Sequence, residues 1–139
     1  FAYFQNIDLG YRTKIFGYRN RFAANSIVYH AGSATSGSRY NAFKTRLASR
    51  NSVYLIYKNM PTLQILLNLP LLMIGFLVKI LFFTRKGMGR EYITGLWKGI
   101  KLSAGPVGRR HKQRFEKKRI RNYVLIQFEL WRNLFRLFA

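Results

Sequence analysis

Only four acidic residues are available for acid–base or metal chemistry: Asp8, Glu91, Glu116 and Glu129. Their separation in sequence excludes a local carboxylate pair, a Walker-type site and an EF-hand. Asp8 belongs to the most specific local pattern, Phe4-Gln5-Asn6-Ile7-Asp8-Leu9-Gly10-Tyr11-Arg12. The amide of Asn6 can orient a hydroxyl but cannot remove its proton. On a helix, Asn6 and Asp8 point about 200° apart, so they cannot face one hydroxyl equally. Asp8 is therefore either a catalytic residue or a residue that caps or braces its helix.

Two further patterns offer ligands for a cation and for phosphate. A neutral His30 suits Mg or Mn only alongside carboxylates, so His30 is either such a ligand or a structural residue. The segment 32–39 that follows carries backbone amides, hydroxyls and a cation, the donor set that a phosphate prefers. Its candidate phosphate- or acceptor-binding residues are Ser33, Thr35, Ser36, Gly37 and Arg39. The same composition is also typical of an ordinary loop.

The charge balance requires an anionic partner. The chain of 139 residues has 25 Lys and Arg against 4 Asp and Glu, a formal net charge of +21, and no Cys. Without Cys there is no disulfide, thiolate-bound zinc or cysteine nucleophile. Hydrophobic residues make up 49%, which excludes a charged, disordered tail.

An apolar segment decides between a membrane and nucleic acid as that partner. Residues 63–83 are apolar except for Gln64, Asn68, Pro70, Gly75 and Lys79. About 20 such residues are enough to cross a bilayer, whereas a soluble nucleic-acid-binding module has no use for them. We therefore expect an anionic membrane surface and no nucleic acid.

Both flanks of this segment are basic, with Lys58 before it and Arg85 and Lys86 after it. The positive-inside rule disfavours translocation of the basic tail, so we favour an interfacial or re-entrant segment over a span. In that arrangement Pro70 and Gly75 break the segment into a helical hairpin, and Lys79 snorkels to the headgroups. A buried core helix of a larger protein is the remaining alternative.

The remaining elements are expected to position these groups. We expect a helix ending near Gly17, a strand over residues 21–29, a loop over 30–40 and a basic amphipathic helix over 41–59. A second amphipathic stretch precedes a Gly/Pro break at 105–108, a basic run over 109–121 and a final helix. Trp97 and Trp131 are expected at the headgroup level, with Lys79, Arg85 and Lys86 contacting the membrane. This divides the chain into residues 1–60, 61–84 and 85–139.

At the Phe4–Arg12 pattern, followed by Gly17-Tyr18 and Val28-Tyr29-His30, the sequence resembles the bacterial family 2 glycosyltransferases of the GT-A fold, and among them rhamnosyltransferase-like enzymes. In that family a helix opens with aromatic-Glu-Asp-x-Asp-Leu-x-x-Arg. The resemblance covers residues 1–60. It implies an α/β fold: the C-terminal, acceptor-side part of a GT-A domain, followed by a mainly helical, membrane-associated tail. A start at Phe1 without Met agrees with a C-terminal piece.

The resemblance also implies a function. Asn6 occupies the position of the family's general base. His30 occupies the position of a residue that helps hold the divalent cation, Mg or Mn. The loop 32–37 corresponds to the loop that lies over the diphosphate in the family. Arg12 follows the family's Arg. The implied enzyme transfers a sugar from a nucleotide to a lipid-linked saccharide, with inversion at the sugar carbon, for cell-surface polysaccharide synthesis. The implied donor sugar is rhamnose. It would work at the cytoplasmic face of the cell membrane, and this chain alone would be inactive. The alternatives are a non-catalytic homologue and a basic membrane-binding protein.

Overall fold

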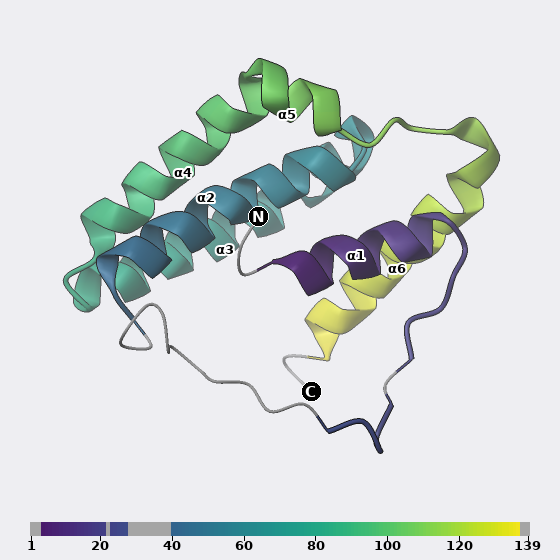
Figure 1. The fold of residues 1–139 in the computed structure, drawn as a ribbon, viewed down its shortest axis with the longest axis horizontal. Coiled ribbons are helices and arrows are strands. Elements are labelled where there is room, and N and C mark those ends of the chain that lie inside the picture. The colour runs from purple at the N-terminus through teal and green to yellow at the C-terminus, as the bar shows by residue number, and fades with distance from the viewer. Residues whose placement is uncertain (1–3, 22, 28–39, 137–139) are drawn as a thin grey trace.

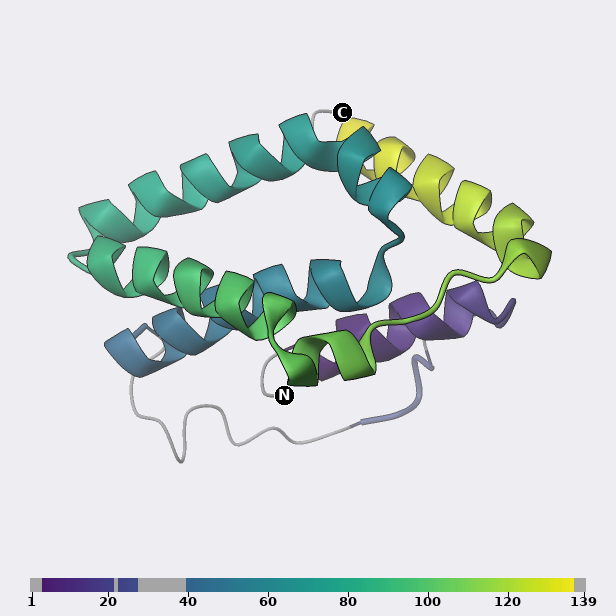
Figure 2. The ribbon, with the colours of Figure 1, turned by 90° about the horizontal axis from the view of Figure 1, so that it is seen from above.

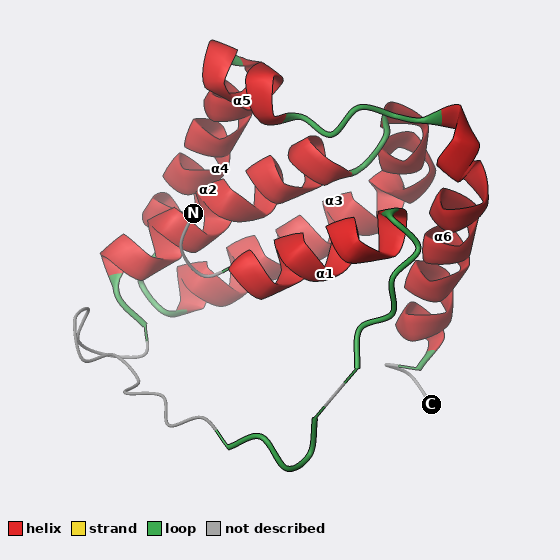
Figure 3. Ribbon diagram, turned by 45° about the vertical axis from the view of Figure 1, so that its right-hand side comes forward, coloured by secondary structure: helices red, strands yellow, loops and turns green. Residues whose placement is uncertain are grey.

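The computed structural model describes residues 4–21, 23–27 and 40–136, and all regular structure within these ranges is helical (Figures 1 and 3). The elements are α1 (Gln5–Ile15), α2 (Ala42–Asn59), α3 (Thr62–Arg85), α4 (Gly89–Ala104), α5 (Pro106–His111), the 3₁₀ turn η1 (Lys117–Arg119) and α6 (Ile120–Phe135).

The α/β prediction is wrong for this chain. Residues 21 and 23–27, within the predicted strand, are irregular, and the described ranges contain no sheet. A strand is stable only when its backbone N–H and C=O groups pair with a neighbouring strand. The rest of the described chain forms helices, so no neighbour is there to pair with this segment.

The first helix ends as the sequence predicts. Gly17 takes a left-handed φ of 86°. Its N–H donates to the Lys14 carbonyl at 2.9 Å, and the Tyr18 N–H donates to the Thr13 carbonyl at 2.9 Å. This pair of hydrogen bonds is the Schellman motif. Glycine has no Cβ, so it takes the left-handed conformation there without steric cost. The predicted end of the helix near Gly17 is therefore confirmed.

The helices form two layers (Figures 1 and 2). In Figure 2, α3 and α6 lie along one side, while α1, α2, α4 and α5 lie along the other. The first layer carries the apolar segment, and the second carries both α1 and most of the basic amphipathic helices. The helix with the predicted acceptor residues Asn6 and Asp8 and the apolar segment thus lie in different layers.

In the second layer, α2 and α4 run parallel and pack closely, with Gly95 and Gly99 of α4 against α2. We call this contact the α2–α4 seam. A Cβ on Gly95 would lie 1.8 Å from Ser49 Oγ, and one on Gly99 would lie 2.6 Å from the Arg50 carbonyl oxygen. Glycine at these two positions lets the backbones approach more closely than side chains would permit. The predicted helix over 41–59 is confirmed, and Asn41 caps it by accepting a hydrogen bond from the Lys44 N–H at 2.8 Å.

The predicted break of the apolar segment at Pro70 and Gly75 is wrong. The ribbon of α3 runs unbroken from Thr62 to Arg85 (Figure 2). One proline removes a single bond from the helical ladder, and the leucine-rich sequence on both sides favours helix. The Gly/Pro break is also more ordered than expected, because Pro106 begins α5 at a position where its missing N–H is not needed.

Candidate functional site

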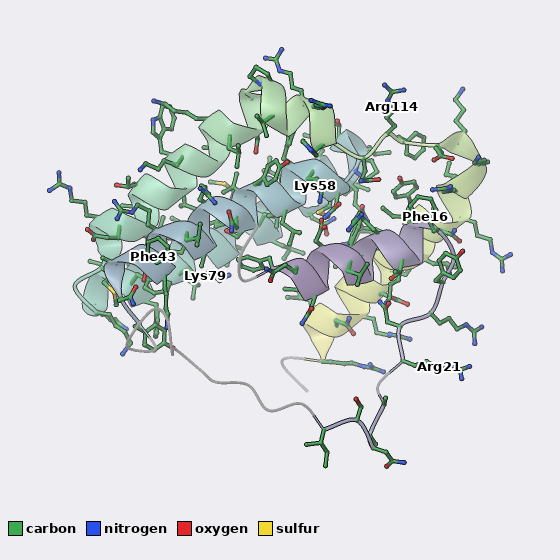
Figure 4. The ribbon with its side chains drawn as sticks, in the orientation of Figure 1. Phe16, Arg21, Phe43, Lys58, Lys79 and Arg114 are labelled. Carbon is green, nitrogen blue, oxygen red and sulfur yellow. The ribbon has the colours of Figure 1, made fainter. Side chains whose placement is uncertain are left out.

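Asp8 is buried at the centre of a polar cluster that joins α1 to α2. Lys58 Nζ donates to both Asp8 carboxylate oxygens at 2.8 Å, and the Asn59 side-chain amide donates to Oδ1 at 2.7 Å. The Arg12 guanidinium lies 3.1 Å from Oδ2, one turn further along α1. The Asp8 and Lys58 side chains are 7% and 15% exposed, so this ion pair is largely screened from water (Figure 4).

The ionised form of Asp8 is favoured despite this burial. Desolvation alone would raise the pKa of Asp8, but hydrogen bonds from Lys58 and Asn59 and the charges of Lys58 and Arg12 outweigh it, and the pKa is lowered. A carboxylate held in this way is a poor proton acceptor. The geometry therefore favours the bracing role of Asp8 over the catalytic one.

Asn6 lies two residues earlier on α1, and its side chain is exposed. It projects from the first turn of the helix, away from the buried side on which Asp8 lies. Arg12 shares the cluster of Asp8. Of the three candidate residues on α1, the structure thus brings Asp8 and Arg12 together and leaves Asn6 open to a ligand.

Further buried polar side chains connect α1 to the layer formed by α3 and α6. The Tyr11 hydroxyl donates to the Gln64 side-chain oxygen, which joins α1 to α3. Asn68 and Gln127 exchange two side-chain hydrogen bonds of 2.8 and 3.0 Å, which join α3 to α6. Sequence reasoning missed these roles. Its available signal was the spacing of Gln64 and Asn68, which are polar interruptions four residues apart and therefore lie on one helix face.

The exposed surface of α3 is mostly apolar. By length and composition α3 is able to cross a membrane, and only 6% of its apolar window is buried. A core helix of a soluble protein passes the same test, but such a helix is mostly buried. The exposed apolar residues of α3 are Leu63, Leu66, Leu67, Leu69, Leu71, Met73, Ile74, Leu77, Val78, Leu81 and Phe82.

The predicted membrane-contacting residues lie on three helices. Lys79 and Arg85 on α3 and Lys86 directly after it are exposed, and Lys86 Nζ lies 5.4 Å from the centre of the Phe82 ring. Trp97 on α4 is exposed with Lys101 Nζ 5.5 Å from its ring centre. Trp131 on α6 is half-buried and packs edge-on against Phe128. The two tryptophans therefore lie on different layers.

A groove of about 600 Å³ lies between the first turns of α3 and one face of α6. Its walls are mostly apolar, and its polar contributors include Gln64 and Lys112. Ligand sites of small molecules span about 300–1,000 Å³ and combine apolar walls with a few polar groups. Sequence reasoning did not find this groove, because its two walls lie about fifty residues apart in the chain.

The remaining predicted residues lie outside the described ranges: His30, Ser33, Thr35, Ser36, Gly37 and Arg39. Within residues 4–21, 23–27 and 40–136, no group of three His, Asp or Glu side chains comes together in a way that would hold a metal ion. The Mg or Mn prediction and the phosphate-loop prediction therefore stay predictions.

Comparison with known proteins found no matching family model, no matching curated protein and no matching solved structure.

Proposed function

We propose that this chain is the membrane-bound, acceptor-side part of a sugar-nucleotide-dependent glycosyltransferase acting on a lipid-linked saccharide. The sugar chemistry rests on the resemblance at Phe4–Arg12 and Gly17-Tyr18. The membrane contact rests on the exposed apolar face of α3 beside basic helices. Anionic lipid headgroups attract such clustered Lys and Arg, and the apolar face inserts among the acyl chains.

An orientation along the membrane surface is supported by the helices on either side of α3. The chain enters α3 from α2 and leaves it into α4, and α2 and α4 pack against each other along their length. A spanning α3 would draw both of these helices into the bilayer. Their basic residues, Lys44, Arg46, Arg50, Lys58, Arg90, Lys98 and Lys101, oppose that insertion. We therefore propose that α3 lies in the interface with α2 and α4 on its cytoplasmic side.

The observation that carries the proposal is the direct connection between the candidate acceptor helix and the membrane layer. The Asp8 cluster fixes α1 to Lys58 and Asn59, at the end of α2, and α3 begins three residues later. Tyr11 then joins α1 to α3 itself through Gln64. Asn6, exposed on α1, is thereby held at a fixed height above the lipid surface, as transfer to a lipid-linked acceptor requires.

The test is transfer of labelled sugar by the intact gene product that contains this chain. Membranes from cells that express it are incubated with labelled dTDP-rhamnose, and label in the lipid extract is measured for the natural protein and for Asn6→Asp. A restored general base should raise turnover by about 10²- to 10⁴-fold. The gain should lie in kcat, since the amide already binds the acceptor hydroxyl. If Asn6→Asp leaves a measurable activity unchanged, α1 is not the acceptor helix.

A non-catalytic, membrane-binding homologue is the second candidate. It is favoured by one observation, that neither Gln5 nor Asn6 carries a titratable group. The same assay separates the two candidates. A homologue without enzyme function transfers no label from any nucleotide sugar, either as the natural protein or as Asn6→Asp, but still binds membranes.

A further inference from the structure

We propose that the groove between α3 and α6 binds a single phosphate-bearing lipid, with a hydrocarbon chain along the groove and the phosphate at the first turn of α3. This deepens the proposed function, because it assigns a site to the lipid part of the acceptor. The proposal rests on the membrane half of that function and not on the sugar chemistry.

The walls of the groove suit a hydrocarbon chain. One wall is formed by Leu63 and Leu67 of α3, and the other by Ile120, Val124 and Phe128 of α6. These side chains are exposed, so the described residues do not cover the groove. Both walls belong to the layer that carries the apolar face of α3, and a lipid chain therefore reaches the groove from the bilayer without passing through water.

The polar end of the groove suits a phosphate. No side chain caps the start of α3, where the first helical bond runs from the Ile65 N–H to the Pro61 carbonyl. The amides of the first turn and the helix dipole favour an anion there. Lys112 adds a cation at the same end, with its Nζ 4.3 Å from the centre of the Tyr57 ring.

A second observation points independently to a ligand at this end. Gln64 is 5% exposed and lines the groove, and its side-chain nitrogen has no hydrogen-bond partner among the described residues. A buried donor without a partner is costly, and native proteins rarely keep one. Its oxygen already accepts from Tyr11, and the nitrogen is the end of the amide that is left without a partner. A phosphate or ester oxygen at the mouth of the groove would satisfy it.

Charge complementarity selects an anionic headgroup over a neutral one. The segment 109–121, which closes this end of the groove, carries eight Lys and Arg and a single acid, Glu116. Glu116 already pairs with Lys118 and Arg119. Among the described residues Lys112 has no such carboxylate partner and is available to a phosphate.

The test uses quenching of Trp131, which lines the groove, by lipids with brominated chains in micelles of a non-ionic detergent. The chain contains two tryptophans, and Trp97→Phe leaves Trp131 as the sole reporter. Brominated phosphatidic acid should quench with saturation at one lipid per chain. Brominated diacylglycerol, which lacks the phosphate, should need a higher mole fraction for the same quenching.

Two variants with matched controls locate the site. Val124→Phe fills the groove and should abolish the saturable quenching, whereas Leu125→Phe, at the next position on α6 and outside the groove, should keep it. Lys112→Gln should weaken the binding of phosphatidic acid about fivefold, which is the effect of one lysine near an anionic lipid. Lys118→Gln should leave this binding unchanged. Circular dichroism verifies that each variant keeps its helices. If Val124→Phe unfolds, the Lys112 pair decides.

Quenching that rises linearly with mole fraction and is equal for both lipids would overturn the proposal, because the groove would then behave like any other apolar surface. The result is separable from the membrane proposal, which vesicle flotation tests. Flotation without saturable quenching rejects the groove alone, and saturable quenching without flotation rejects membrane binding alone.

Discussion

The α2–α4 seam and the outer side of α3 have opposite chemistry. In the seam, Ser49 is 1% exposed, and glycines bring the two backbones together. On α3 the largest apolar side chains face outward, and its buried residues are Gln64 and Asn68. Soluble proteins bury apolar and expose polar groups, so α3 shows an inverted pattern.

On α3, this inversion leaves most of the apolar side chains outside the packed interior. The contacts between layers combine hydrogen bonds, such as Tyr11 to Gln64, with an apolar cluster of Ile15, Tyr123 and Ile126 between α1 and α6. The contacts within the seam are close backbone packing. Close backbone approach through small residues, as in the seam, is also common in helix pairs within membranes. The exposed apolar side of α3 and the buried contacts involve different residues, so each can be altered separately.

The largest effect is expected from charges on the outer side of α3. Ile74 and Val78 are both 59% exposed and contribute nothing to the interior, so Ile74→Asp with Val78→Asp should keep the fold. Each aspartate costs up to about 3 kcal/mol in hydrocarbon, and the pair should lower vesicle partitioning about 100-fold or more. Flotation with neutral vesicles at high salt measures this, because salt suppresses electrostatic adsorption.

The matched control places the same charges on the other layer. Leu9 on α1 and Phe43 on α2 are 56% and 58% exposed, and Leu9→Asp with Phe43→Asp should float like the natural chain (Figure 4 labels Phe43). Equal losses for both pairs would show that exposed apolar residues everywhere contribute to binding. The two layers would then not differ in function.

The next effect concerns the Asp8 cluster, which joins α1 to α2 within the second layer. Asp8→Asn leaves Lys58 and Arg12 without their carboxylate, and loss of one partner of a buried pair costs about 3 kcal/mol. Chemical denaturation followed by circular dichroism measures the change. Glu129→Gln, which removes the half-exposed partner of Lys14, is the control and should cost far less. Equal effects would contradict the central role of the Asp8 cluster.

Acid should reproduce part of this loss. Because the pKa of Asp8 is lowered in the folded chain, its stabilisation is complete above the unfolded value of 3.8 and is lost as pH falls through the folded pKa. Stability should therefore decrease below about pH 4 in the natural chain. The decrease should be smaller in Asp8→Asn, and identical acid profiles would exclude Asp8 as its source.

A smaller effect is expected in the seam. A Cβ at Gly99 would approach the Arg50 carbonyl oxygen to 2.6 Å and the Val53 Cβ to 2.8 Å, so Gly99→Ala must separate the two helices. Overpacking of this kind costs about 1–3 kcal/mol, of which better helix propensity returns a part. Thermal unfolding should show a lower Tm. An unchanged Tm would mean that α2 and α4 are less closely packed than the geometry indicates.

The sequence predicted individual helices more reliably than the contacts between segments that lie far apart in the chain. The period of residues 41–59 and the Gly17 turn are local signals, and both are confirmed. The strand over 21–29 was wrong, because strand formation depends on a neighbour that local pattern does not reveal. The Asp8 cluster was beyond reach for the same reason, since Lys58 and Asn59 are about fifty residues away. The polar spacing of Gln64 and Asn68 was a local signal, and it was left unused.

The smallest effect is expected at Gly75, and it distinguishes lipid from a protein partner as the surface that contacts the outer side of α3. A Cβ on Gly75 meets nothing within 4 Å, so Gly75→Ala clashes with no described part of the chain. Alanine is a better helix former by about 0.5–1 kcal/mol, and α3 should be stabilised by that amount. Unfolding measured in lipid vesicles should show this gain, because acyl chains rearrange around an added methyl group. A rigid protein surface packed on Gly75 would not. Loss of stability in Gly75→Ala when the protein is bound to its membrane would therefore indicate that a protein partner, and not lipid, covers the outer side of α3.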